Sequence, residues 1–223
     1  TYYGSSPSAS KALVSQLSNG QYRLLVLRAD GSVIMKDGPY NAGWWSGTVE
    51  ASGVSDIVIG GDRIGIVTSG GDFKVKHLTP GQFSHPNDVA WSLQTTNVAS
   101  ASLTNQHLAI VDISGNVRGK SGSINAGWWG DVLYNNTSKV HLSGYRMCVL
   151  KTSNNVECKE GDINYFNVTS KLVYDSATDV KINSNRIAVR TSGNNAFVLE
   201  GPIYGANSGW QQIGTNVGSL ELN

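Results

Sequence analysis

One β-strand motif occurs five times along the chain, about 40 residues apart, and this repeat limits the possible folds more than any other feature. Each copy begins with a basic residue that is followed by mostly apolar residues: Arg23, Arg63, His107, Arg146 and Arg186. Thirteen residues later stands Lys36, Lys76, Lys120 or Lys159, and Leu199 in the last copy. Since no copy has an insertion between these two positions, we predict a hairpin of fixed length in every repeat.

Each repeat reads as four short strands separated by turn residues. The chain has 26 Gly and only 5 Pro among 223 residues, a composition typical of turn-rich β-proteins. A single four-stranded sheet cannot bury both of its faces, whereas sheets fanned around an axis cover one another. We therefore predict an all-β, five-bladed β-propeller with four antiparallel strands per blade, and the alternative is a solenoid. The expected single domain is 1–223, with repeats at 21–60, 61–104, 105–143, 144–183 and 184–223.

The two ends of the chain both resemble the strand that precedes the motif, so six copies of this strand compete for five blades. The two copies at the ends of the chain lie at 11–18 and 217–223. We expect residues 11–18 to be an extra strand for closure, with one end of the chain completing a blade that the other begins. The alternative is a homo-oligomer, a dimer that exchanges the spare strand.

Cys148 and Cys158 are the only cysteines, and they lie in the fixed hairpin of the fourth repeat. If they face each other, the same offset pairs apolar or small residues in the other repeats, as facing positions in a blade require. This register also places an acidic residue opposite Arg23, Arg146 and Arg186. We therefore predict a disulfide and cross-strand ion pairs, which gives the recurring Arg a structural role. The acidic residues are Asp37, Glu160 and Glu200.

A disulfide is typical of an oxidising compartment, and three glycosylation sequons agree with it, at Asn135, Asn136 and Asn167. We therefore expect a secreted glycoprotein, already processed, because the first residues lack the charged and apolar regions of a signal peptide. The formal charge of +1 argues against nucleic acid as a partner. No apolar run is long enough for membrane insertion. The spacing of His, Cys and acidic residues predicts no metal and no cofactor.

The order of motifs in each repeat resembles the tectonin and tachylectin-like propeller lectins. The residues that carry this resemblance are 45–49 (WSGTV), 55–60 (SDIVIG) and 63–67 (RIGIV). The resemblance spans about residues 11–223. It implies a propeller that binds glycans or glycoproteins on cell surfaces or microbes, in shallow pockets repeated once per blade, with a role in defence. The fourth repeat departs from this pattern because its loop has no Trp.

Sugar recognition needs an aromatic face for the pyranose ring and planar amides for its hydroxyl groups. The loop after the recurring Lys supplies both, through an Asn-x-Gly-Trp pattern. The predicted ligand-binding residues are Lys36, Asn41, Gly43, Trp44, Trp45, Trp91, Lys120, Asn125, Gly127, Trp128, Trp129, Asn207, Gly209 and Trp210. Three alternatives stay open: the Trp residues are packing wedges between blades, the Asn residues are turn formers, and the Lys residues are solvated.

Five-bladed propellers also host glycosidases, which need two carboxyl groups across one cleft. The candidates are Asp56, Asp179 and Glu221, on the polar face of the predicted innermost strands. Equivalent positions in other repeats hold Lys, Ser or Val, as expected for the lining of a wet channel. We therefore predict a lectin without catalytic activity, and the main alternative is a propeller that binds protein or has a structural role.

Overall fold

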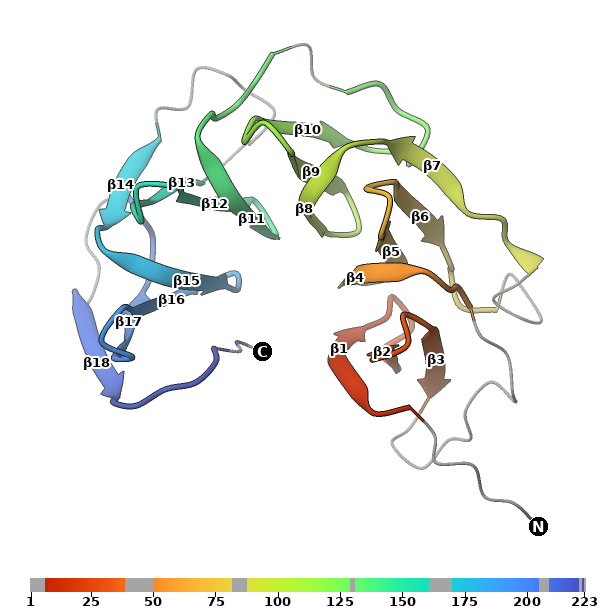
Figure 1. Cartoon of the computed structure of the whole chain (residues 1–223), viewed down its shortest axis with the longest axis horizontal. Coiled ribbons are helices and arrows are strands. Elements are labelled where there is room, and N and C mark those ends of the chain that lie inside the picture. Colours follow the sequence, from red (N-terminus) through yellow and green to blue (C-terminus); the bar gives the residue numbers. More distant parts are fainter. Residues whose placement is uncertain are drawn as a thin grey trace. The chain divides into compact units, whose positions relative to one another are not determined.

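The computed structural model describes residues 7–38, 50–81, 88–128, 131–160, 170–204, 209–220 and 222. In this part of the chain, eighteen β-strands form five antiparallel sheets, which we number as blades one to five (Figure 1). The chain divides into two compact units, residues 1–98 and 99–223.

The first unit contains blades one and two, and in each the strands pair in the order of the chain. Blade one consists of β1 (Ala9–Gln16), β2 (Tyr22–Arg28) and β3 (Val33–Gly38). Blade two consists of β4 (Val54–Gly60), β5 (Arg63–Thr68), β6 (Phe73–His77) and β7 (Ser92–Thr95).

The second unit contains three blades, in which the strands also pair in the order of the chain. Among the described residues, blades two, four and five have the predicted four strands, and blades one and three have three. Blade three consists of β8 (Val98–Leu103), β9 (His107–Asp112) and β10 (Val117–Ser121), and β8 begins at the boundary between the units. Blade four consists of β11 (Thr137–Ser143), β12 (Arg146–Lys151), β13 (Val156–Glu160) and β14 (Lys171–Tyr174). Blade five consists of β15 (Ala177–Ile182), β16 (Arg186–Thr191), β17 (Ala196–Glu200) and β18 (Trp210–Gly214).

The first strands of consecutive blades lie side by side within each unit, as expected for the innermost strands of a propeller. In the first unit, Lys11 Nζ on β1 lies 2.6 Å from Asp56 Oδ1 on β4. In the second, Lys139 Nζ on β11 lies 2.8 Å from Asp179 Oδ1 on β15. The polar face that the sequence assigns to these strands therefore links neighbouring blades through ion pairs.

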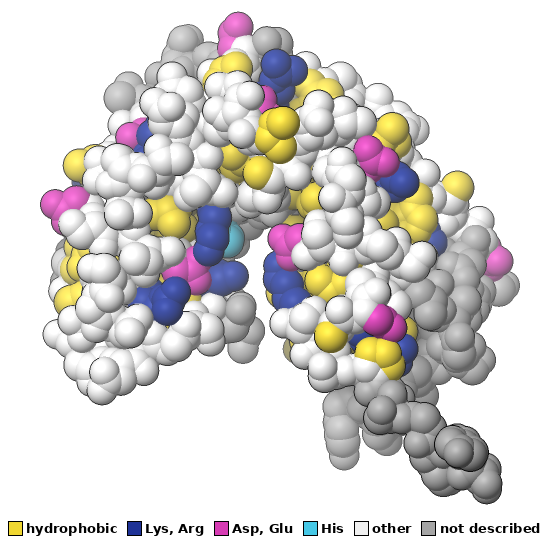
Figure 2. All heavy atoms as spheres, in the orientation of Figure 1, with side chains coloured by type: hydrophobic (Ala, Val, Ile, Leu, Met, Phe, Trp, Pro, Cys, Tyr) yellow, Lys and Arg dark blue, Asp and Glu magenta, His cyan; other side chains and the backbone are white. Residues whose placement is uncertain are grey.

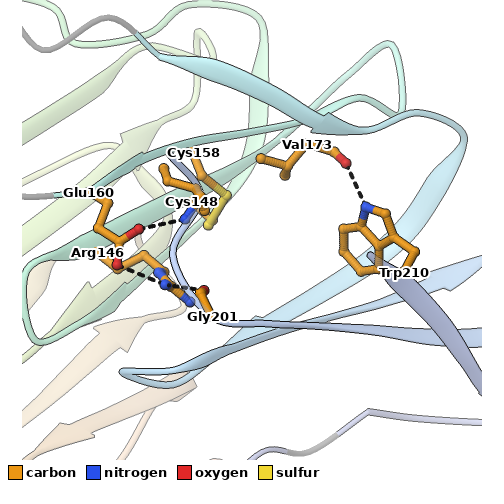
Figure 3. Close-up of a disulfide and its surroundings, with 8 residues drawn as sticks. Arg146, Cys148, Cys158, Glu160, Val173, Gly201 and Trp210 are labelled. Carbon is orange, nitrogen blue, oxygen red and sulfur yellow. Dashed lines mark hydrogen bonds and ion pairs between the residues drawn. A yellow bond between two sulfur atoms is a disulfide. The ribbon is translucent and has the colours of Figure 1, made fainter. Parts of the chain in front are cut away.

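The predicted hairpin register is confirmed in every blade. Cys148 faces Cys158, and the two form the predicted disulfide with their Cα atoms 4.1 Å apart (Figure 3). The same offset gives the predicted facing pairs in the other blades: Leu25–Met35, Gly65–Val75, Ala109–Gly119 and Ala188–Val198. The predicted ion pairs are confirmed as well: Arg23–Asp37, Arg146–Glu160 and Arg186–Glu200.

The sequence repeat and the blade differ in phase by one strand. A repeat such as 21–60 covers β2 and β3 of one blade and then β4, the first strand of the next blade. Residues 11–18, expected as an extra strand for closure, lie mostly in β1, which pairs with β2 as the regular first strand of blade one. Residues 217–220 have no strand assignment. Even so, Val217 N donates to Asn194 O at 2.8 Å, the same bond by which the first strand of blades two to five is joined to the preceding blade.

The turn between the second and third strands fixes where the next blade begins. In all five blades it contains a residue with positive φ, either Gly or Asn, which are the types that adopt this conformation most readily: Gly31, Gly71, Gly115, Asn154 and Asn194. The carbonyl of this residue accepts a hydrogen bond from the first residue of the following strand, for example from Val54 N to Gly31 O at 3.0 Å. A side chain at Gly31 would approach Val54 O to 3.3 Å. At Gly31 the turn therefore needs both the left-handed conformation and little bulk, whereas blades four and five have Asn at this position.

Apolar side chains fill the space between adjacent blades of one unit. Blades one and two share a cluster that includes Leu25, Met35, Ile57 and Ile64. Blades four and five share one that includes the disulfide together with Val180 and Ile187. Because each blade covers one face of its neighbour, the loops at the blade ends are left to carry polar residues.

Candidate functional site

The loop that follows the third strand of blade three contains the best-described part of the predicted ligand site. Lys120 is only 3% exposed. Its ammonium group donates hydrogen bonds to the carbonyl of Ile124 and, at 3.1 Å, to the carbonyl of Ala126. It also lies 5.2 Å from the centroid of the Trp128 ring, a cation–π distance. The buried lysine therefore fixes the backbone of this loop.

This arrangement leaves polar and aromatic groups of the loop accessible. Asn125 and Gly127 are exposed, and Trp128 is half-buried. Asn125 N is held by Ser123 Oγ at 3.2 Å, so the residue is fixed through its backbone. An exposed amide and a partly exposed indole on a fixed loop are the groups that sugar recognition requires.

The recurring lysine is buried in three blades, so the alternative that it is solvated is wrong for Lys76, Lys120 and Lys159. Each of these ammonium groups lies over an aromatic ring: Trp91, Trp128 and Tyr134 respectively. Burial lowers the pKa of Lys159, and it lowers the pKa of Lys76 against the opposing effect of Glu50, whose carboxylate lies 3.8 Å away. Lys120 therefore positions the loop, and direct ligand contact by this residue stays a prediction. Lys36 is half-buried.

Two of the predicted ligand-binding tryptophans join neighbouring blades. Trp91 Nε1 donates to Glu50 O of blade one at 3.2 Å, and Trp210 Nε1 donates to Val173 O of blade four at 2.9 Å (Figure 3). Both indoles are half-buried, and Trp210 packs edge-on against Tyr174 with the ring centroids 4.8 Å apart. These contacts agree with the alternative that a recurring Trp is a wedge between blades. Ligand binding by Trp91 and Trp210 stays a prediction.

Several predicted residues lie outside the described part of the chain: Asn41, Gly43, Trp44, Trp45, Trp129, Asn167, Asn207 and Glu221. Gly209 is exposed, with a positive φ of 69°. Of the predicted glycosylation sites, Asn135 and Asn136 are both exposed, and the Thr137 hydroxyl donates to Asn135 O at 3.1 Å. Glycosylation itself stays a prediction.

Of the carboxylates proposed for a glycosidase, the two that the structure describes, Asp56 and Asp179, are engaged in ion pairs. Burial raises the pKa of Asp179, but the hydrogen bond and charge of Lys139, together with Lys181 and His141, outweigh it and hold the pKa below its ordinary value. Basic, acidic and histidine side chains lie together near the first strands of blades four and five (Figure 2). Asp56 is paired with Lys11. A carboxyl group with a lowered pKa is poorly suited to be the general acid of a glycosidase.

In the part of the chain that the structure describes, no cluster of three or more His, Cys, Asp or Glu side chains could hold a metal ion. The described residues also contain no helix long and apolar enough to cross a membrane.

Blade two departs from the recurring ion pair, because Arg63 faces His77 instead of a carboxylate. His77 is exposed, but partial desolvation still lowers its pKa below the ordinary value of 6.5, and the charges of Arg63 and Arg23 lower it further against the effect of Asp62. The unfolded chain therefore binds a proton at this residue more readily than the folded chain does. The titration of His77 therefore costs the folded state no stability above about pH 6.5. The folded state loses stability as the pH falls below this value toward the lower pKa of the folded chain.

We expect His77→Gln to reduce the loss of stability between pH 7 and pH 5, because the titrating group is removed. His77→Glu should raise the urea midpoint at pH 7 by restoring the Arg–carboxylate pair of the other blades. Urea denaturation of both variants and the wild type across this pH range checks both results. Identical pH profiles for His77→Gln and the wild type would contradict the first expectation.

Comparison with known proteins identifies the fold through structure rather than sequence. No family model and no curated protein sequence matches the chain. Among solved structures, human WBSCR16 has a TM-score of 0.59 at 11% identity over 80% of this chain, and Kluyveromyces lactis Hsv2p has 0.57 at 11% identity over 96%. The chain is a five-bladed β-propeller.

The propeller is shorter than these neighbours. It covers 59% of the WBSCR16 chain and 75% of the Hsv2p chain. Prp20p from Saccharomyces cerevisiae has a TM-score of 0.55 at 8% identity over 82% of this chain and 57% of its own. The chain therefore spans less than two thirds of the length of WBSCR16 and Prp20p. Likenesses at this level of identity establish the fold alone, and the neighbours are of the RCC1 and Hsv2 types instead of the tectonin type.

Proposed function

We propose that this propeller is a carbohydrate-binding protein, a lectin without catalytic activity that recognises glycans at loops on the ends of its blades. The observation that carries the proposal is the blade-three loop, in which the buried ammonium of Lys120 holds two carbonyls and the Trp128 ring. A loop that is already fixed before binding loses less conformational entropy when a ligand docks. Shallow sugar sites are individually weak, so this saving in entropy matters for affinity.

Repetition of the loop supports a multivalent lectin. Several weak sites on one rigid scaffold raise avidity by about 10²- to 10⁴-fold when the spacing of the target glycans permits it. The disulfide Cys148–Cys158 and the exposed sequon residues Asn135 and Asn136 suit a secreted glycoprotein. In this proposal the protein acts outside the cell on cell-surface or microbial glycans, in a defence role.

Trp128→Ala tests the proposal directly. We expect the variant to bind the glycan about 2- to 12-fold more weakly, because an aromatic contact of this kind contributes about 0.5–1.5 kcal/mol. Its melting temperature should fall only slightly, since the indole is half-buried and the carbonyls of Ile124 and Ala126 still hold the Lys120 ammonium. A glycan array identifies the ligand, and calorimetric titration with the corresponding methyl glycoside measures the affinity.

Leu172→Ala is the matched control, because this side chain is also exposed but lies on the fourth strand of blade four. We expect it to bind sugar as the wild type does. Wild-type silence on the array and in red-cell agglutination would contradict the proposed function. Unfolding of Trp128→Ala would instead assign the indole to the core.

Protein binding is the second candidate, and one observation favours it. The side chains of Leu93, Val132 and Leu172 are exposed apolar groups on the outer part of blades two, three and four. Among the structural neighbours, Prp20p is described with its binding to Gsp1p and histones. Loss of a protein partner in Leu93→Ser or Leu172→Ser, with no glycan binding by the wild type, would favour this candidate.

A further inference from the structure

The turn between the first two strands of blade four presents an aromatic ring to solvent. Tyr145 is 63% exposed, which is unusual for so large an apolar surface. Its ring lies edge-on to the ring of His107 in blade three, with the centroids 6.2 Å apart and the planes at 68°. His107 is buried. A buried ring beneath an exposed one limits the orientations of the exposed ring.

The contact depends on a position at which blade three differs from the other blades. Here His107 and Ser121 face each other, whereas blades one, four and five have an Arg and a carboxylate at these positions. In blade one, the Arg23 guanidinium reaches the carbonyls of Asp62 and Leu78 in the next blade. The shorter imidazole of His107 instead meets the ring of Tyr145 on blade four.

Neutral polar residues flank His107 in the chain and lie in the loop bonded to its turn. Gln106, next to His107 in the chain, is exposed, and its carbonyl accepts a hydrogen bond from Gly122 N at 2.7 Å. This bond joins the 104–107 turn to the loop that Lys120 fixes. Apart from the buried His107, the segments 104–107 and 121–128 contain only uncharged residues. Their exposed polar residues carry amides and hydroxyls: Asn105, Gln106, Ser123 and Asn125.

We propose that Tyr145 is the stacking platform of a glycan site shared by blades three and four, and that this site takes neutral pyranosides. The inference rests on the proposed function and adds to it a residue outside the recurring Trp loop. The exposed face of the tyrosine ring covers the C–H face of the sugar, and the Gln106 amide binds its hydroxyl groups. An acidic sugar would bring a carboxylate to a surface without an exposed cation in these two segments, which is unfavourable.

Titration of methyl glycosides into the wild type, Tyr145→Ala and Tyr145→Phe tests this site. We expect Tyr145→Ala to weaken binding of the neutral glycoside by about 2- to 12-fold, the value of one aromatic contact. Tyr145→Phe keeps the ring and should bind within about twofold of the wild type. Gln106→Ala should weaken binding as well, and Leu172→Ala should not. Circular dichroism and melting confirm that each variant is folded.

The outcomes separate this inference from the proposed function. If no glycan binds the wild type, both are overturned. If the wild type binds sugar and Trp128→Ala loses it, while Tyr145→Ala binds normally, only the Tyr145 site is overturned. If binding depends on Tyr145 but selects acidic over neutral glycans, the assigned ligand class is overturned. Weaker neutral-sugar binding in Tyr145→Ala with binding retained in Tyr145→Phe supports the site.

Discussion

Arg23→Met is expected to destabilise the protein by about 3–5 kcal/mol, because it leaves a carboxylate and two carbonyls without their buried donor. Arg23 is 0% exposed. Its Nε and Nη2 donate to the two oxygens of Asp37 at 2.7 and 2.6 Å. Its Nη1 and Nη2 also donate to the carbonyls of Asp62 and Leu78 in blade two, at 3.2 and 3.1 Å. One side chain therefore joins two strands of blade one and fixes blade two against them.

Arg186→Met is the matched comparison, since this residue has the same place in blade five and the same kind of partner, Glu200, at 2.6 Å. Its side chain is 50% exposed and that of Glu200 is 44% exposed, so the loss should stay within about 1 kcal/mol. The double variant Arg23→Met/Asp37→Leu should recover part of the loss, because no unpaired carboxylate remains. Urea denaturation gives all three values. Equal losses for Arg23→Met and Arg186→Met would contradict the role of burial.

The hairpin register could be predicted from the sequence because two constraints agree. The distance from the basic residue to the recurring Lys is constant, and a disulfide between Cys148 and Cys158 allows only one pairing of the strands. Once that pairing is set, the positions of Asp37, Glu160 and Glu200 follow. The other bonds of the arginines could not be predicted in this way. Whether Arg146 reaches Gly201 O, at 2.9 Å, depends on which neighbouring blade it faces (Figure 3).

A second recurring feature was present in the sequence and was missed. The first strand of blades one, two, four and five has a register shift at a Ser or Thr. The hydroxyl of this residue donates to a carbonyl on the second strand, at 3.0–3.1 Å: Ser10, Ser55, Ser138 and Thr178. A bulge of this kind leaves one residue outside the ladder, and the hydroxyl replaces the missing pairing. The recurrence of Ser or Thr at this position was the available indication.

The burial of the candidate-site residues could be predicted less well than the fold, because residue type is a weak guide to burial. Lysine is normally solvated, yet Lys120 is buried because loop carbonyls and the Trp128 ring satisfy its charge. The same reasoning assigned Trp210 to ligand binding, while its indole N–H is used by Val173 O of the preceding blade. Tyr145 could not be singled out as a ligand-binding residue from the sequence, since the only other Tyr at this position of the repeat is Tyr22 of blade one. Its exposure becomes evident only in the folded blade.

Removal of the disulfide is expected to have the second largest effect on stability. Cys148→Ala/Cys158→Val places at these positions the residues that blade five has naturally, Ala188 and Val198. The new side chains should therefore fit, and the loss in the free energy of unfolding reflects the cross-link itself. A bond that closes a loop of sequence separation 10 stabilises the folded state by about 2–3 kcal/mol in the chain-entropy model. We expect a lower urea midpoint for the double variant, measured by tryptophan fluorescence.

A reductant separates the loss of the cross-link from altered packing. Both cysteines are fully buried against blade five, so reduction of the native protein should be slow and should follow unfolding. Wild type that is unfolded in urea with a reductant should therefore refold to a species with the stability of the double variant. The double variant itself should give one midpoint with and without reductant. A double variant as stable as the oxidised wild type would show that blade four does not depend on the disulfide.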